Sequence, residues 1–364
     1  MTAPQTIQRT QRPRRQDNSP RLWSLLAILL ILRHREKQER IADLVEVDMA
    51  RSWKILNFHD LASTEPAWLD ASLDKLGIRY EQSQRATADL VNDLRTLVAL
   101  ERRRSVPEPI RFVFPSEDVA ADDLRGPTVV AKPMDERRVA KRLLAMGPGA
   151  VKHAMPAPED VAMPSGLSGA TGVAVESVGE GGRTLSLQAA EVDDELVGYQ
   201  RVCESDSRVC AFCALLASRG PVYFDLGKIA ATDTKWSLKE REGDDTARVA
   251  ALDETPDSSA KAHAHCRCTL IPVFASNRLG VFGWAEVAEK IWNDPDEYGW
   301  EWKGDWVADR RAFRKAFDAY KASHPDEGAD GFDYSALRAA LKDVERDRTD
   351  YEMARFLNRV TRGL

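Results

Sequence analysis

The first hundred residues repeat apolar and polar positions with the period of an α-helix. An apolar run from Leu22 to Leu32 leads into a charged segment in which apolar residues recur at helical spacing. These apolar positions are Ile41, Leu44, Val45, Met49 and Trp53. Ala86 to Arg102 repeats the pattern in a second amphipathic segment. The sequence predicts a helical N-terminal domain over residues 22–104, whose apolar stripe faces a core or a partner helix.

The apolar run at Leu22 to Leu32 is too short to cross a bilayer, which takes about 20 residues in a helix. Basic residues precede it, as in a signal peptide, but the charged segment that begins at Arg33 follows directly, with no small-residue cleavage site. We therefore expect no contact with a membrane.

Residues 105–200 give a mixed pattern. Ile110 to Phe114 reads as a short strand, and Asp135 to Met146 reads as a helix. The stretch near 154–183 is rich in Gly, Ala, Pro and Ser, which favours a linker or an extended loop. Glu191 to Arg201 then reads as renewed helix.

Four of the five cysteines of the chain stand in two short clusters. Cys210 and Cys213 form a CxxC pair, and His263, Cys266 and Cys268 form an HxxCxC group further along the chain. Such pairs chelate zinc without long loops, because Zn²⁺ takes four sulfur or nitrogen ligands at tetrahedral geometry. The spacing predicts a bound metal in a structural role.

Several points about this site stay open. Disulfide, redox and inert buried cysteines are the alternatives to a metal. The ligands are either the four cysteines of the two clusters or a set in which His263 replaces Cys266 or Cys268. A catalytic zinc is disfavoured, since the chain has no HExxH motif.

The residues around the cysteines predict a small helix-plus-sheet module over 201–275. Arg208 to Ser218 reads as a short helix, followed by a strand near 222–224. Thr269 to Phe274 reads as a buried strand. The acidic, polar residues 237–260 separate the two clusters and read as a solvated loop.

This module resembles the MuF-like minor head proteins, or head morphogenesis proteins, of tailed phages, especially those of actinobacteriophages. The similar residues are the run CAFCALLASRGPVY from Cys210, the HxxCxC group from His263, and the PVF that ends at Phe274. The resemblance implies a protein present in few copies inside the phage head near the portal, with a role in head assembly, DNA packaging or ejection. It implies portal, capsid or scaffold proteins as partners, and the virion and the host cytoplasm as locations. Some members are thought to bind DNA.

The charge of the chain is unevenly distributed. The formal net charge of −6 argues against an overall cationic DNA-binding protein, whereas residues 1–40 carry nine Lys and Arg against three acidic residues. We expect residues 1–21 to form a basic disordered tail, and this tail is the candidate contact to phage DNA.

The C-terminal region, 276–364, is rich in tryptophan and charge. Five of the nine tryptophans lie between Trp284 and Trp306 among acidic residues, a mixture that fits a packed helical tail or a protein-binding surface better than a single-stranded DNA site. Helices are predicted over Asp309 to Ala322 and Tyr334 to Val360.

Together these patterns predict a mainly helical α+β protein with an N-terminal helical domain, a small zinc-type Cys/His module and a helical C-terminal tail. We find no catalytic constellation in the sequence and expect a non-enzymatic minor capsid protein. The alternatives are a metal-dependent capsid maturation protease or hydrolase, and an intracellular zinc-binding nucleic-acid module.

Overall fold

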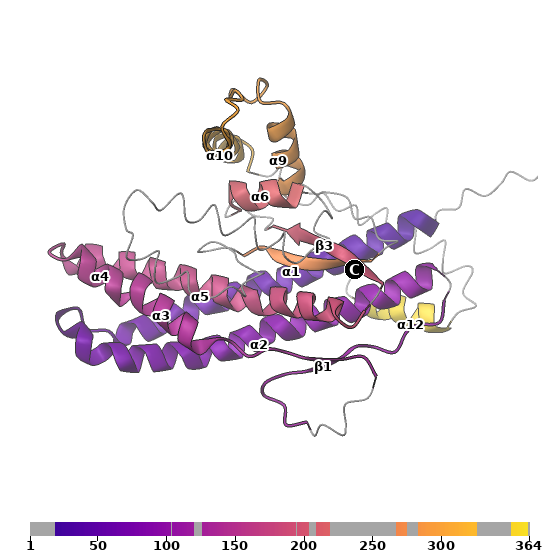
Figure 1. Cartoon of the computed structure of the whole chain (residues 1–364), viewed down its shortest axis with the longest axis horizontal. Helices are drawn as coiled ribbons and strands as arrows, with labels where there is room; N and C mark the ends of the chain where they lie inside the picture. Colours follow the sequence, from indigo (N-terminus) through magenta and orange to yellow (C-terminus); the bar gives the residue numbers. More distant parts are fainter. Residues whose placement is uncertain are drawn as a thin grey trace, which may run out of the picture.

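Three long helices form the base of the molecule (Figure 1). α1 (Ser19–Ser52) and α2 (Leu61–Glu101) make a helical hairpin, and α5 (Glu159–Ala190) packs against both. The computed structural model describes residues 19–102, 104–119, 126–193, 195–203, 209–218, 267–274, 283–325 and 351–362. The remaining elements are η1 (Trp53–Ile55), η2 (Phe58–Asp60), β1 (Arg111–Val113), β2 (Thr128–Val130), α3 (Glu136–Met146), α4 (Pro148–Ala154), β3 (Leu196–Val202), α6 (Ala211–Ser218), β4 (Thr269–Phe274), α9 (Trp284–Asn293), α10 (Trp306–Ser323) and α12 (Tyr351–Val360).

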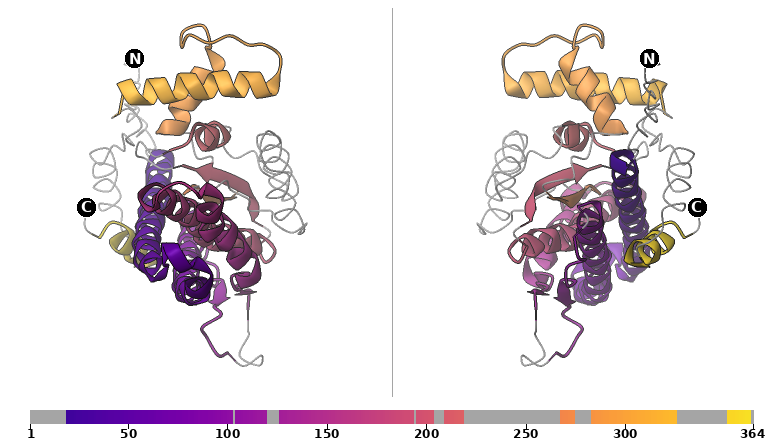
Figure 2. Two further views of the ribbon diagram at one scale, coloured as in Figure 1. Left: turned by 90° about the vertical axis from the view of Figure 1, so that its left-hand side faces the viewer. Right: turned by 90° about the vertical axis from the view of Figure 1, so that its right-hand side faces the viewer.

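Above the helical base lie a small sheet and then a second helical layer (Figures 1 and 2). β3 and β4 pair antiparallel, with Tyr199 opposite Pro272, and β4 packs on α5. On the other side of this sheet α6 contacts β3, and α9 and α10 cover α6. A separate parallel pair, β1 with β2, lies at the opposite side of the base. The fold is mainly helical with two small sheets, as the sequence predicts.

The apolar stripe of α1 forms much of the core of the base. Val45, Met49 and Trp53 are buried there, and the ring of Trp53 packs edge-on against that of Trp68 in α2. Leu44, which the sequence pattern grouped with this stripe, instead faces solvent with 43% of its surface exposed. The helical period places position 44 beyond the edge of the stripe that meets α2 and α5.

The prediction of a linker near 154–183 is wrong, because these residues lie mostly within the 32-residue helix α5. Its glycines bring α5 close to α2. A Cβ on Gly181 would lie 2.8 Å from the carbonyl oxygen of Tyr80, and one on Gly182 would lie 2.6 Å from Oγ1 of Thr87. Small residues that read as a flexible loop therefore serve here as a close helix–helix contact, and packing outweighs their weak helix propensity.

The predicted helix over Glu191 to Arg201 is also wrong, since α5 ends at Ala190 and residues 196–202 form β3. The tertiary partner decides this segment: pairing with the buried strand β4 satisfies its backbone polar groups. The predicted strands at 110–114 and 269–274 and the helix that ends at Met146 are confirmed.

Four tryptophans of the C-terminal region, Trp284, Trp292, Trp300 and Trp302, pack against one another or against aromatic side chains of α10. Trp284 and Trp300 are buried with Phe313 and Phe317, while Trp302 is half exposed. This confirms a packed helical element. α10 and α12 confirm helix within the two predicted C-terminal segments.

Several predicted features lie outside the described residues, namely most of the basic tail 1–21, the strand near 222–224 and the acidic loop 237–260. Among the helices that are described, none combines the length and apolarity that a membrane span requires.

Candidate functional site

The first cysteine pair lies at the start of α6. Cys210 directly precedes this helix, and Cys213 lies buried in its first turn. The backbone N–H of Cys213 donates to Sγ of Cys210 over 3.2 Å. A sulfur that accepts from the backbone of its own turn is held in one orientation, which suits a metal-binding CxxC turn.

The second cluster reaches the first through Cys268, which directly precedes β4. Its Sγ lies 3.8 Å from Sγ of Cys213, and both side chains are buried. A disulfide requires about 2.05 Å, so this pair is not bonded. Two sulfurs on one tetrahedral zinc, with Zn–S bonds of about 2.3 Å, are separated by about 3.8 Å.

A further thiol, Cys203, lies in the same buried cluster at the end of β3. Burial raises the pKa of the Cys203 thiol, and the nearby sulfurs of Cys268 and Cys210 act in the same direction, while Arg35 opposes them. All four cysteines in the described part of the chain are free, which removes a disulfide among them.

Arginine side chains surround Cys268. Nη1 of Arg201 in β3 donates to Sγ of Cys268 over 2.8 Å. Nη1 of Arg183 in α5 donates to the carbonyl oxygen of Cys268 over 3.1 Å, and its Nη2 donates to the carbonyl oxygen of Glu176 over 2.9 Å. Arg183 and Arg201 are almost fully buried. The two guanidinium groups therefore place positive charge beside the sulfur and the backbone of Cys268.

Arg267, between the last two cysteines of the sequence motif, joins this segment to α1. Its buried guanidinium pairs with Asp43 over 2.7 Å and with Glu46. In addition, Oγ of Ser186 in α5 donates to the carbonyl oxygen of Leu270 over 3.0 Å. The cysteine cluster is thus fixed to the helical base from two helices.

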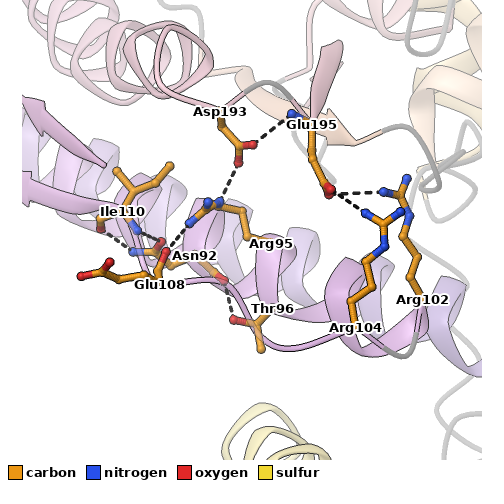
Figure 3. A network of polar contacts seen from close by, with 9 residues as sticks. All are labelled: Asn92, Arg95, Thr96, Arg102, Arg104, Glu108, Ile110, Asp193 and Glu195. Carbon is orange, nitrogen blue, oxygen red and sulfur yellow. Dashed lines mark hydrogen bonds and ion pairs between the residues drawn. The ribbon is translucent and has the colours of Figure 1, made fainter. Parts of the chain in front are cut away.

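The N-terminal end of β3 is held by a polar network at the C-terminal end of α2 (Figure 3). Nε of Arg95 pairs with Asp193 over 2.5 Å, and Glu195 lies between Arg102 and Arg104, at 3.2 and 2.8 Å. These pairs hold the turn between α5 and β3 against α2, so the strand that carries Arg201 begins from a fixed position.

Of the predicted metal ligands, the structure brings Cys210, Cys213 and Cys268 together. His263 and Cys266 lie outside the described residues. Within the described ranges, no three or more His, Cys, Asp or Glu side chains are grouped so that they could hold a metal ion. The distance between the sulfurs of Cys213 and Cys268 and the N–H donors to the sulfurs of Cys210 and Cys268 fit zinc. The remaining ligand would then be His263 or Cys266.

Sequence reasoning did not find Cys203 or the three arginines as part of this site. The place of Arg267 inside the HxxCxC group was the one signal available. Arg183 and Arg201 carried none, because their proximity to Cys268 depends on how α5 and the sheet pack.

A family model described as VG15 protein matches residues 30–284, which includes the helical base, the sheet and the cysteine cluster. No curated protein and no solved structure matches the chain.

Proposed function

We propose that this chain, which belongs to the VG15 protein family, is a non-enzymatic minor head protein of a tailed phage. In this proposal it acts inside the head near the portal, in assembly, DNA packaging or ejection. Its partners are portal, capsid or scaffold proteins, and the basic residues 1–21 contact DNA.

The observation that carries the proposal is the position of the residues that resemble MuF-like head proteins. Cys210, Cys213, Cys268 and the strand that ends at Phe274 meet at one point between the sheet and α6. The motif cysteines that the structure describes thus lie together, with Cys213 and Cys268 buried and Cys210 half-buried. Because the cluster is buried under α6, α9 and α10, it supports a role in stabilising these helices, whose outer surfaces would bind the partner proteins.

Purified virions test this role directly. Mass spectrometry should detect the chain in heads of the phage that encodes it, and deletion of its gene should lower the yield of DNA-filled heads. Virions without the chain, together with normal head assembly in the deletion strain, would reject the proposal. Specific cleavage of the major capsid protein by the purified chain would favour the protease alternative.

We also propose that the cluster holds one structural Zn²⁺ through Cys210, Cys213 and Cys268, with His263 or Cys266 completing the set. The metal would supply a cross-link between α6 and the start of β4, two elements that are separated in sequence by residues 219–268. A structural zinc of this kind contributes on the order of 10 kcal/mol to folding, so its loss should be easy to measure.

Metal analysis of the full-length protein tests the zinc site. We expect about one zinc per chain in the wild type, loss of most of it in Cys213→Ser, and a lower melting temperature for that variant. Ala217→Ser is the matched control, because Ala217 is as buried as Cys213 in the same helix α6 but carries no sulfur. Well under one zinc in the wild type, or equal zinc content and melting temperature in Cys213→Ser, contradicts the site.

A further inference from the structure

We propose that a hollow between α1 and α2 binds a phosphate group. The hollow has a volume of about 390 Å³ and is lined by residues of these two helices. The lining residues lie outside the cysteine cluster, so the proposal depends neither on the zinc site nor on the role in the phage head. Pockets of this size take small molecules or the part of a larger molecule that enters them.

Two cations line the hollow without an ion pair of their own. Arg51 of α1 and Lys75 of α2 are both exposed, and neither pairs with a carboxylate in the described part of the chain. Positive side chains gathered on a concave surface concentrate the electric field there and attract anions. Arg51 and Lys75 are thus available to an anion that enters the hollow.

The carboxylate in the lining, Asp48, is already neutralised. Nε of Arg79 lies 2.9 Å from Oδ2 of Asp48, and Nη1 of Arg79 donates to Oε1 of Gln82 over 3.0 Å. Three positive side chains and one negative side chain line the hollow, which leaves a net charge of +2. A phosphate monoester carries about −1.5 to −2 charges at pH 7 and matches this value, whereas a single carboxylate would neutralise only half of it.

Contacts between the two helices on either side of the unpaired cations hold the hollow open. Asp48 pairs with Arg79 on one side, and Oγ of Ser52 lies 2.9 Å from Oγ of Ser72 on the other. The two cations lie between these contacts along α1 and α2. A ligand therefore has to order only two side chains, which keeps the entropic cost of binding small.

The pairing of an arginine with a lysine favours phosphate as the ligand. A guanidinium binds two phosphate oxygens through parallel N–H donors, and an ammonium group adds a compact positive charge. The small side chain of Ala71 leaves space between the helices, and the exposed Ile78 adds apolar surface to the lining. The hollow therefore also has room for the organic group of a phosphate ester.

Melting temperatures of the full-length protein test the site with inorganic phosphate as the probe. Phosphate replaces chloride at constant ionic strength, so that general screening stays the same. We expect a saturable rise in melting temperature with a dissociation constant of about 1 mM. The double variant Arg51→Gln/Lys75→Gln should bind at least about 10-fold more weakly, because hydrogen bonds to a charged group are lost at both positions. Both side chains are exposed, so this variant should fold normally.

Arg137→Gln/Lys141→Gln is the matched control. Arg137 and Lys141 are exposed on α3 and form no ion pair with another described residue, so this variant loses the same charge outside the hollow. We expect it to bind phosphate like the wild type, and any binding to the basic residues 1–21 is common to both double variants. Equal affinities in the two double variants, or no saturable rise in the wild type, overturn the proposal.

Ala71→Leu tests the hollow itself, because the larger side chain fills the space and leaves the charge unchanged. We expect it to weaken phosphate binding at least about 5-fold, provided that its melting curve shows a folded protein without ligand. Wild-type affinity in Ala71→Leu would place the anion on the open surface and contradict the site.

Deoxyadenosine monophosphate and a short DNA duplex distinguish the sources of the phosphate group. If the mononucleotide raises the melting temperature at lower concentration than inorganic phosphate, the ligand is a small phosphate ester. If the duplex does so in the wild type and the control but not in Arg51→Gln/Lys75→Gln, the ligand is the DNA backbone; if neither does, it is inorganic phosphate. Acetate that stabilises the wild type as much as phosphate does would identify a site for acidic side chains of a partner protein and overturn the phosphate assignment.

Discussion

His34 illustrates how burial changes a single residue. The structure places this histidine in the interior of the base, with Nδ1 3.2 Å from the carbonyl oxygen of Ala86. Burial lowers its pKa from the usual 6.5 to about 4; the hydrogen bond to Ala86 opposes this shift, and Lys37 adds to it. His34 is therefore neutral in the folded protein near neutral pH.

This residue makes stability depend on pH. The pKa of His34 is lower in the folded than in the unfolded protein. The contribution of neutral His34 to stability is therefore fully present above pH 6.5 and is lost as the pH falls toward 4. Between pH 8 and pH 5 we expect the free energy of unfolding to fall by about 2 kcal/mol from this group alone. Urea denaturation at pH 8 and at pH 5 measures this change in the free energy of unfolding.

His34→Gln is the control for that measurement, since glutamine keeps a donor for Ala86 but does not titrate. Subtracting the pH dependence of the variant's unfolding free energy from that of the wild type removes the contribution of other groups, including any metal. Equal pH slopes in the two proteins would show that His34 is already accessible to protons in the folded state.

At the scale of the element, α5 depends on close contact more than on local propensity. Gly181 has no room for a side chain, because a Cβ would lie 2.8 Å from the backbone oxygen of Tyr80. We expect Gly181→Ala to destabilise the protein by about 1–3 kcal/mol, since a backbone atom cannot move aside as a side chain can. Thermal or urea unfolding measures the change.

Gly77 provides the matched comparison in α2, where a Cβ would meet nothing within 4 Å. Gly77→Ala should stabilise the protein by about 0.5–1 kcal/mol through its better helix propensity. If both substitutions stabilise the protein, α5 does not approach α2 as closely as the structure indicates.

At the scale of the whole molecule, the last described helix packs against the first. α12 packs on the N-terminal half of α1 and the C-terminal half of α2, where Phe356, Leu357 and Val360 join their core. Arg33 of α1 donates to the carbonyl oxygens of Val360 and Arg362, and Arg359 pairs with Asp93 over 2.5 Å. α12 is therefore part of the base rather than of a separate tail.

If α12 unfolds together with the base, Leu357→Ala should lower the free energy of global unfolding by about 3 kcal/mol, because Leu357 is 1% exposed. Asn358→Ala, at the adjacent exposed position, should change it by less than about 0.5 kcal/mol. Hydrogen exchange of α1 and α12 gives an independent measurement. An unchanged free energy in Leu357→Ala would mean that α12 opens without the base.

Much of the local structure could be predicted from sequence. The helical period of α1 and of the second half of α2, the helix predicted from Asp135 to Met146 and the apolar strand β4 all depend on neighbouring residues, so the pattern sufficed. The prediction was wrong where a distant partner decides the outcome. Glycine-rich α5 is helical because α2 lies against it, and residues 196–202 form a strand because β4 is available.

The sequence by itself determined the fold class, most helix positions and the cysteine motif, since each is written in the spacing of nearby side chains. Only the tertiary structure brought Cys268 within 3.8 Å of Cys213 and added Cys203, Arg183 and Arg201 to the same site. These contacts join residues that are distant in sequence, and local periodicity carries no information about which helix packs on which sheet. The physical reason is that the spacing of buried sulfurs and charges is a property of packed surfaces.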